Sequence, residues 1–194
     1  MKYTAEYNAR GEMREINRLA SSSFLFYIGI SILVMAMLLS IGIFALDYFK
    51  VPPDHILLGR GIIALIALNS LAVFAGNSMF RIILGLQRYD ISAVIDMVFN
   101  TLFVGTVFLL VQMGYGVLEL VFVEVVLANF RVLAGAVMVS RLLPSLELRL
   151  GYVTREVFHR VMKFSLTVMV TALAILVLYQ TDKLILAVFI GASI

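Results

Sequence analysis

The stretch FLFYIGISILVMAMLLSIGIFAL, residues 24–46, decides the fold, because it contains no charged residue in 23 positions. About twenty apolar residues form a helix long enough to cross the hydrocarbon core of a bilayer. A helix satisfies its own backbone hydrogen bonds in lipid, so the stretch predicts a transmembrane α-helix. Three serines at 21–23 open the run and Asp47 closes it.

The composition of the whole chain agrees with this interpretation. Its 194 residues are 62% hydrophobic and only 14% charged, whereas soluble domains have about 45–50% apolar and about 25% charged residues. We therefore expect an integral membrane protein. The absence of cysteine excludes a disulfide framework, a thiolate metal site and a cysteine nucleophile. The segment 1–23 carries too many charges to be a signal peptide.

Further apolar segments follow residues 24–46, and they predict an all-α, polytopic transmembrane helical bundle with about five spans. The last segment is still apolar where the chain stops. The predicted order is a cytoplasmic N-terminal segment 1–23, a span 24–46, an external loop 47–61, a span 62–86, a cytoplasmic turn 87–96, a span 97–113, an external turn 114–116, a span 117–143, a cytoplasmic interfacial segment 144–163 and a final span 164–194.

Lysine and arginine residues are distributed unevenly between the two sides of this topology. Segments 1–23, 81–88 and 141–163 together carry eleven of them, whereas 47–61 and 114–116 carry two. Short loops rich in lysine and arginine stay in the cytoplasm. We therefore predict a multi-pass protein of the cytoplasmic (inner) membrane, surrounded by membrane lipid, with a cytoplasmic N-terminus.

Arg131 is the charge that this topology explains least well. It lies roughly 21 Å along a span of roughly 40 Å, near the middle of the membrane. An arginine there costs about 2.5–3.5 kcal/mol unless it faces water or a partner. Glu124 projects within roughly 20° of Arg131 on the same helix, so the two side chains share one face. Three interpretations remain open: a buried polar pair that fastens helices, a polar translocation face, and snorkelling to the headgroups.

A second group of polar residues lies on span 62–86 and just after it. Ser70, Asn77, Arg81 and Arg88 fall within roughly 40° of one another on an ideal helix. Small polar residues often pack helix against helix in membranes. The stripe therefore predicts either a helix contact or the lining of a hydrophilic cavity.

Three further charges lie at or near predicted helix ends. Asp96 precedes span 97–113, where its carboxylate would complement the positive end of the helix dipole, so we expect it to cap that helix. Asp182 and Lys183 lie either at the outer end of the last span or inside a longer one.

Signatures of enzymes are missing from the sequence. It has no GxGxxG or Walker A loop, and its two histidines, His55 and His159, lie on opposite sides of the predicted membrane. We therefore predict a protein that is not an enzyme and that has no cofactor and no metal site. Nucleic acid is not an expected partner, and no oligomeric state is indicated.

Three stretches resemble the polysaccharide flippases of the MOP/MATE-like superfamily, to which multidrug exporters also belong. YNARGEMREINRLASSSFLF (7–26) is similar to the lead into the third helix of that family, and ILGLQRYD (83–90) to its turn between the fourth and fifth helices. VMKFSLTVMVTALAILVLYQTDKLILAVFIG (161–191) resembles its seventh helix. The resemblance implies a fragment with helices three to seven, part of the N-terminal lobe plus the first helix of the C-terminal lobe.

The resemblance also implies a function, which is the flipping of a polyprenyl-(pyro)phosphate-linked oligosaccharide across the membrane by alternating access, for polysaccharide biosynthesis. Cationic groups such as Arg131 and Arg81 would then attract the anionic head of this lipid. One alternative is a multidrug or toxic-compound exporter, in which Glu124 and Asp182 would dominate. Another is a membrane scaffold subunit that transports nothing. The candidate residues of the substrate path are Arg131, Glu124, Arg81, Asn77, Asp182 and Lys183.

Overall fold

The computed structural model describes residues 2–45, 53–157, 159, 162 and 170. The chain divides into two compact units, Met1–Val153 and Thr154–Ile194. In the second unit, Arg155, Glu156 and Val157 are helical, and the Val157 N–H donates a hydrogen bond to the Thr154 hydroxyl at 3.4 Å. The predicted span 164–194, with Asp182 and Lys183, lies outside the described residues apart from position 170.

Helices make up the first unit, and the ranges described contain no strand. Four helical segments are long and apolar enough to cross a membrane, namely Met13–Phe44, Ile56–Gly85, Tyr89–Gln112 and Val117–Leu142. The prediction of an all-α polytopic bundle is therefore confirmed. The elements are α1 (Lys2–Ala9), α2 (Met13–Ser40), the π-helical turn η1 (Ile41–Ala45), α4 (Pro53–Gly85), α5 (Tyr89–Gln112), α6 (Val117–Leu142) and the 3-10 turn η2 (Leu150–Tyr152).

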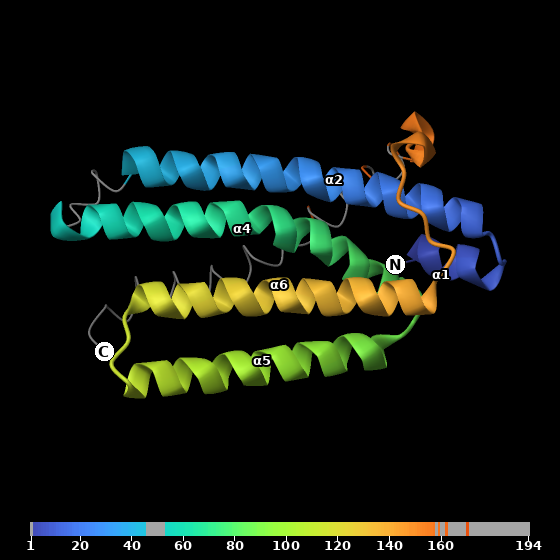
Figure 1. Cartoon of the computed structure of the whole chain (residues 1–194). Helices are drawn as coiled ribbons and strands as arrows, with labels where there is room; N and C mark the ends of the chain where they lie inside the picture. The colour runs from blue at the N-terminus through green and yellow to red at the C-terminus, as the bar shows by residue number, and fades with distance from the viewer. Residues whose placement is uncertain (1, 46–52, 158, 160–161, 163–169, 171–194) are drawn as a thin grey trace, which may run out of the picture. The chain divides into compact units, whose positions relative to one another are not determined.

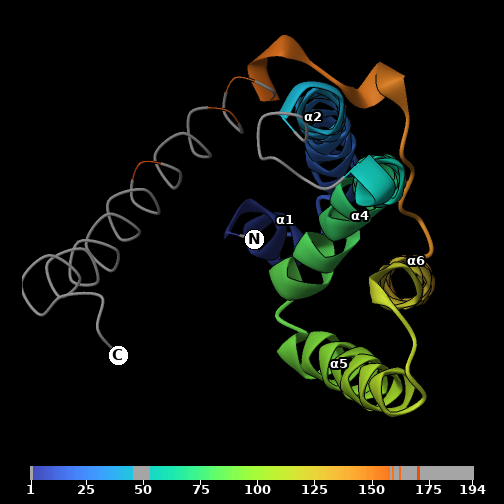
Figure 2. The same cartoon turned by 90° about the vertical axis from the view of Figure 1, so that its left-hand side faces the viewer.

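The four long helices run side by side, each antiparallel to the next along the chain (Figure 1). Helix α1, the turn between α4 and α5, and the chain that follows α6 all lie at one end of the bundle. The turn between α5 and α6 lies at the other end. Seen end-on, α4 lies between α2 and α6, while α5 lies on the side away from α2 (Figure 2). The segments predicted to be cytoplasmic in this unit therefore share one end.

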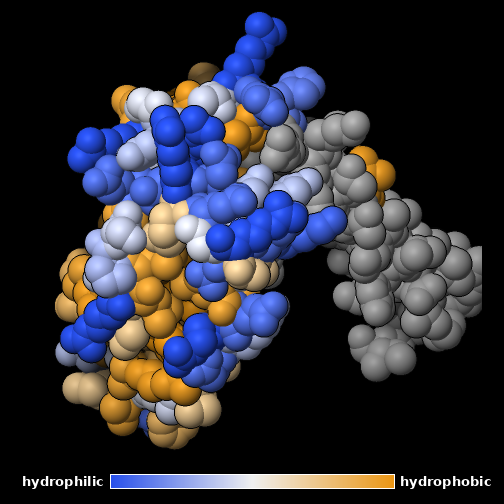
Figure 3. Space-filling view, turned by 90° about the vertical axis from the view of Figure 1, so that its right-hand side faces the viewer, coloured by the Kyte–Doolittle hydropathy of each residue, from blue (hydrophilic) through white to orange (hydrophobic). Residues whose placement is uncertain are grey.

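The buried core of the bundle lies toward that same end. It combines the start of α2, the end of α4, the second turn of α5 and the end of α6, and consists of Ile16, Ala20, Met79, Phe80, Ile82, Ile83, Ile95, Val139 and Leu143. Elsewhere most apolar side chains of the spans are at least partly exposed. Only 6% to 11% of the most apolar window of each span is buried. Figure 3 views the end near α1, where hydrophilic side chains gather beside hydrophobic surface. Such outward apolar surface fits a lipid environment.

Helices α4 and α6 approach each other closely at two glycines. A Cβ atom on Gly76 would overlap the side chain of Val132, and one on Gly135 would overlap the ring of Phe80. Small residues allow such close contact between membrane helices, where dispersion replaces the hydrophobic driving force. The Asn129 side-chain amide donates a hydrogen bond across the same contact to Oδ1 of Asn69 at 2.6 Å. Together these contacts fix the register of α4 against α6.

Two polar side chains of α2 hold the chain that follows α6. The Asn17 amide donates to the carbonyl of Ser145 at 3.3 Å and accepts from the N–H of Glu147 at 3.2 Å. One turn later, the Ser21 hydroxyl donates to the Glu147 carbonyl at 3.4 Å and accepts from the Arg149 N–H at 3.2 Å. The first part of the predicted interfacial segment 144–163 is therefore bound to α2 through its backbone.

Helix α5 begins earlier than the predicted span 97–113. It starts at Tyr89, after a short turn in which Gln87 has a φ of 61°. Arg88 at this turn is ion-paired with Asp90, with Nη2 2.9 Å from Oδ2. Asp96 therefore lies at the end of the second helical turn instead of before the first. The prediction that Asp96 caps the helix is wrong, because its backbone is already inside the helical hydrogen-bond ladder.

Candidate functional site

Arg131 lies near the middle of the apolar helix α6. The helix runs from Val117 to Leu142 over 26 residues, which corresponds to a length of about 39 Å. Arg131 is about 16 Å from the Leu142 end, so its backbone lies well inside the span. A cation at this depth requires a compensating partner or water.

The partner is Asp96 on α5. The Nε and Nη2 atoms of Arg131 lie 2.8 Å and 2.6 Å from the same carboxylate oxygen, Oδ1 of Asp96. The two side chains remain 30% and 40% exposed, so the pair faces an opening and is not sealed in the core. The structure places Glu124 elsewhere and shows no ion pair between it and Arg131. The polar pair predicted between Arg131 and Glu124 is therefore replaced by an ion pair between Arg131 and Asp96, which joins α6 to α5.

Phe80 of α4 holds Arg131 from a second side. The guanidinium carbon lies 4.3 Å from the centroid of the Phe80 ring, a distance at which the cation is attracted to the ring face. Phe80 itself is only 4% exposed. It reaches this position because Gly135 of α6 leaves room for the ring. The guanidinium is thus fixed by a ring from α4 and a carboxylate from α5.

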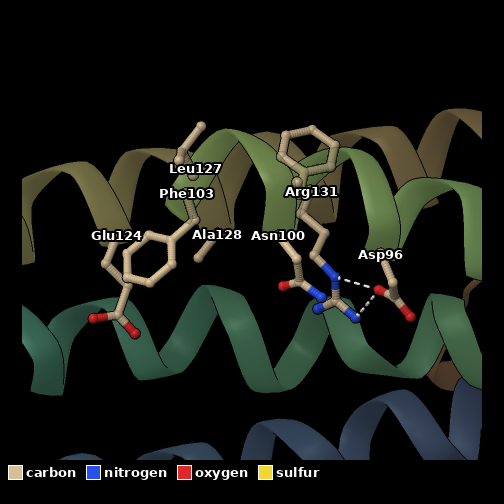
Figure 4. Close-up of a pocket in the computed structure, with 8 residues that line it drawn as sticks. Asp96, Asn100, Phe103, Glu124, Leu127, Ala128 and Arg131 are labelled. Atoms are coloured by element: carbon tan, nitrogen blue, oxygen red, sulfur yellow. Dashed lines mark hydrogen bonds and ion pairs between the residues drawn. The ribbon is translucent and has the colours of Figure 1, made fainter. Parts of the chain in front are cut away.

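An open pocket of about 470 Å³ lies between α5 and α6 beside this pair. Figure 4 shows Glu124 at one end of the pocket, the Arg131–Asp96 pair at the other, and Asn100 next to the pair. Arg131 and Glu124 share this pocket, as their helical spacing predicts. The pocket is lined by Asp96, Phe99, Asn100, Phe103, Glu124, Leu127, Ala128 and Arg131.

The polar residues predicted to form a stripe on α4 and just after it lie apart from this pocket. On α4, Asn77 is half-buried and Arg81 is exposed, and neither lines the pocket. Ser70 is buried and donates its hydroxyl hydrogen to the Ala67 carbonyl of its own helix at 2.6 Å. Arg88 lies beyond the end of α4. The predicted stripe is therefore not one continuous polar lining.

Sequence reasoning found Arg131 and Glu124 but missed Asp96, Asn100 and Phe80. Asp96 and Asn100 are one helical turn apart, which puts both on one face of α5. The four-residue spacing of Asp96 and Asn100 is the sequence signal for this polar face. A helix predicted to begin only after Asp96 does not contain both residues, so the prediction does not include the face.

Comparisons with protein-family models, with curated proteins and with solved structures find no match for this chain. Within the described ranges, no group of three or more potential metal-binding side chains comes together. The chemistry available to the pocket in these ranges is therefore that of one guanidinium, two carboxylates, an amide and apolar walls.

Proposed function

We propose that this protein forms part of a membrane transporter that flips a polyprenyl-(pyro)phosphate-linked oligosaccharide across the cytoplasmic membrane by alternating access. The observation that supports this function is the fixed guanidinium of Arg131 at the wall of an open pocket within the span. A packed scaffold has no need of a partly exposed arginine at this depth, because such a charge is costly to insert.

The guanidinium suits the anionic head of such a lipid. It carries five N–H donors in a planar fork that matches phosphate oxygens. Asp96 accepts from Nε and Nη2 through a single oxygen, which leaves the Nη1 donors for a second acceptor. Because the ring of Phe80 holds the guanidinium in place, a ligand has little side-chain entropy to overcome on binding.

The remainder of the pocket suits the sugar. The Asn100 amide and the Glu124 carboxylate provide hydrogen-bond donors and acceptors for hydroxyl groups. Phe99 and Phe103 add apolar surface along the same wall. An anionic group at Arg131 and a saccharide toward Glu124 would therefore lie along one pocket.

A second candidate is the export of cationic compounds, and the charge balance of the pocket favours it. Asp96 and Glu124 contribute two negative charges and Arg131 one positive charge, so the lining carries one net negative charge. Asp96 already neutralises Arg131, which leaves Glu124 as the group that would attract a cation. The two functions therefore depend on different residues of the same pocket.

Variants introduced into the chromosomal gene separate the two functions. Arg131→Ala should lose export of surface polysaccharide and accumulate the lipid-linked precursor, while Arg131→Lys should keep part of the export, because it retains charge without the planar fork. Membrane levels, followed by immunoblot, should match the wild type in both. Polysaccharide export at the wild-type rate in Arg131→Ala would contradict the flippase, and reduced efflux of a cationic dye in Glu124→Gln would then favour the exporter.

A further inference from the structure

Asp96 occupies one edge of the Arg131 guanidinium at which a phosphate group can bind through two N–H donors. The Nε and Nη2 hydrogens point along one edge of the planar fork, and both are accepted by Oδ1 of Asp96 at 2.8 Å and 2.6 Å. Two parallel N–H donors on one edge form the usual bidentate site for carboxylate or phosphate. An anion can therefore bind fully to this edge only after the carboxylate has left.

Arg131 also needs a negative partner when the pocket is empty. A charge at membrane depth without compensation is strongly unfavourable, and removal of one member of an ion pair leaves the other uncompensated. Among the described residues, Asp96 is the acid that forms an ion pair with Arg131, whereas Glu124 lies at the far end of the pocket (Figure 4). Asp96 therefore provides the charge compensation of the unloaded site.

We propose that Asp96 is the resident counter-ion of Arg131, and that an anionic phosphate head group enters the pocket by replacing it on the Nε–Nη2 edge. This inference rests on the proposed function and names the event by which its substrate binds. The exchange needs little movement of Arg131, because the ring of Phe80 holds the guanidinium from the other side. Asp96 is 40% exposed, so its carboxylate has pocket solvent to move into.

The exchange explains why a transporter would keep an acid next to its anion site. A ligand that must break the Arg131–Asp96 pair binds less tightly than it would to a free guanidinium, because the energy of the pair is subtracted. The same pair re-forms when the ligand leaves, which favours release. Transport requires binding that is favourable enough for entry and weak enough for exit, and Asp96 sets that balance.

The test is the affinity of the purified full chain for inorganic pyrophosphate, measured by calorimetry in detergent at fixed ionic strength. Asp96→Asn keeps the shape of the side chain and removes its charge, so it should bind pyrophosphate about tenfold more tightly, equivalent to about 1.4 kcal/mol. Asp96→Glu retains the competing charge and should stay within about threefold of the wild type, well short of that gain.

Glu124→Gln is the matched comparison, because it removes the same charge from the same pocket without freeing Arg131. It should tighten binding by about threefold or less, since only a longer-range repulsion is lost. An equal gain in Glu124→Gln and Asp96→Asn would overturn the counter-ion role, as would unchanged or weaker binding by Asp96→Asn.

A measurement on the wild type decides the matter if Asp96→Asn does not fold. In protein labelled with ¹⁵N-arginine, pyrophosphate should shift the Nε resonance of Arg131, assigned by its loss in Arg131→Lys. Binding without that shift would overturn the exchange and leave the proposed function standing. No pyrophosphate binding by the wild type or by any folded variant would contradict the anionic substrate itself, and with it the proposed function.

Discussion

Gly135 decides where the Arg131 guanidinium lies, although it has no polar atom in its side chain. A methyl group at this position would overlap the Phe80 ring, and the ring in turn supports the cation at 4.3 Å. The position of the charge therefore depends on a missing side chain four residues along the same helix. Interactions of this kind are not visible in the pattern of hydrophobic residues alone.

Gly135→Ala should therefore destabilise the bundle, because overfilling a packed contact typically costs about 1–3 kcal/mol. Gly105→Ala is the matched control, since nothing lies within 4 Å of its Cβ position and alanine is the better helix former. Thermal unfolding in detergent should show a lower midpoint for Gly135→Ala and an unchanged or higher one for Gly105→Ala. Equal midpoints would contradict the tight α4–α6 contact.

Arg131 could be identified from the sequence, because a single cation in a long apolar run has a recognisable cost. Its partner could not, because helical spacing relates residues of one helix and says nothing of the neighbouring helix. Glu124 lies on the same face of α6 and lines the same pocket, but the ion pair of Arg131 is with Asp96 of α5. The sequence therefore predicts the cation of the site but not its partner.

At the scale of elements, the main departure from the sequence-based expectation is the start of α5. The sequence predicts a cytoplasmic turn at 87–96 and a span that begins at 97, whereas the helix begins at Tyr89. Both acids are compensated by arginines, Asp90 by Arg88 and Asp96 by Arg131. Asp90 lies in the first turn of α5. Asp96 lies farther inside, where an acid with such a partner is compatible with a helix, and hydropathy does not register the partner.

The contact between α2 and the chain after α6 gives a prediction for these elements. Asn17→Ala removes the acceptor of the Glu147 N–H, and Ser21→Ala removes that of the Arg149 N–H. One hydrogen bond contributes about 1 kcal/mol, so each amide should exchange with deuterium about fivefold faster in its own variant. Ser40→Ala, whose hydroxyl donates to Ala36 of its own helix, should leave both rates unchanged.

Amide-resolved exchange by NMR measures these rates directly. Unchanged protection of Glu147 in Asn17→Ala would show that α2 does not hold the linker. A loss of protection throughout the bundle would indicate global destabilisation instead, and the Ser21→Ala variant separates these outcomes because it affects a different amide.

At the scale of the whole molecule, the class of protein follows from composition, and the described helices agree with it. A chain with 62% hydrophobic residues cannot bury them all in a bundle of this size, and only 6% to 11% of the apolar windows of the spans is in fact buried. The residues at the two ends of the bundle carry the information on orientation. Hydropathy therefore predicts the spans, whereas the direction in which they cross depends on lysine and arginine alone.

The last prediction concerns that direction. In the first unit, the turn at 114–116 and the linker at 143–149 lie at opposite ends of the bundle (Figure 1), so the two must lie on opposite sides of the membrane. The chain has no cysteine, so Tyr115→Cys and Arg149→Cys each provide a single thiol at an exposed position. In intact cells an impermeant maleimide should label Tyr115→Cys at once and Arg149→Cys only after lysis.

The charge bias requires this result, because the end with Arg149 carries most of the basic residues and translocating them is unfavourable. Labelling of Arg149→Cys from outside would reverse the orientation, and labelling of both positions would contradict the spanning arrangement of α6.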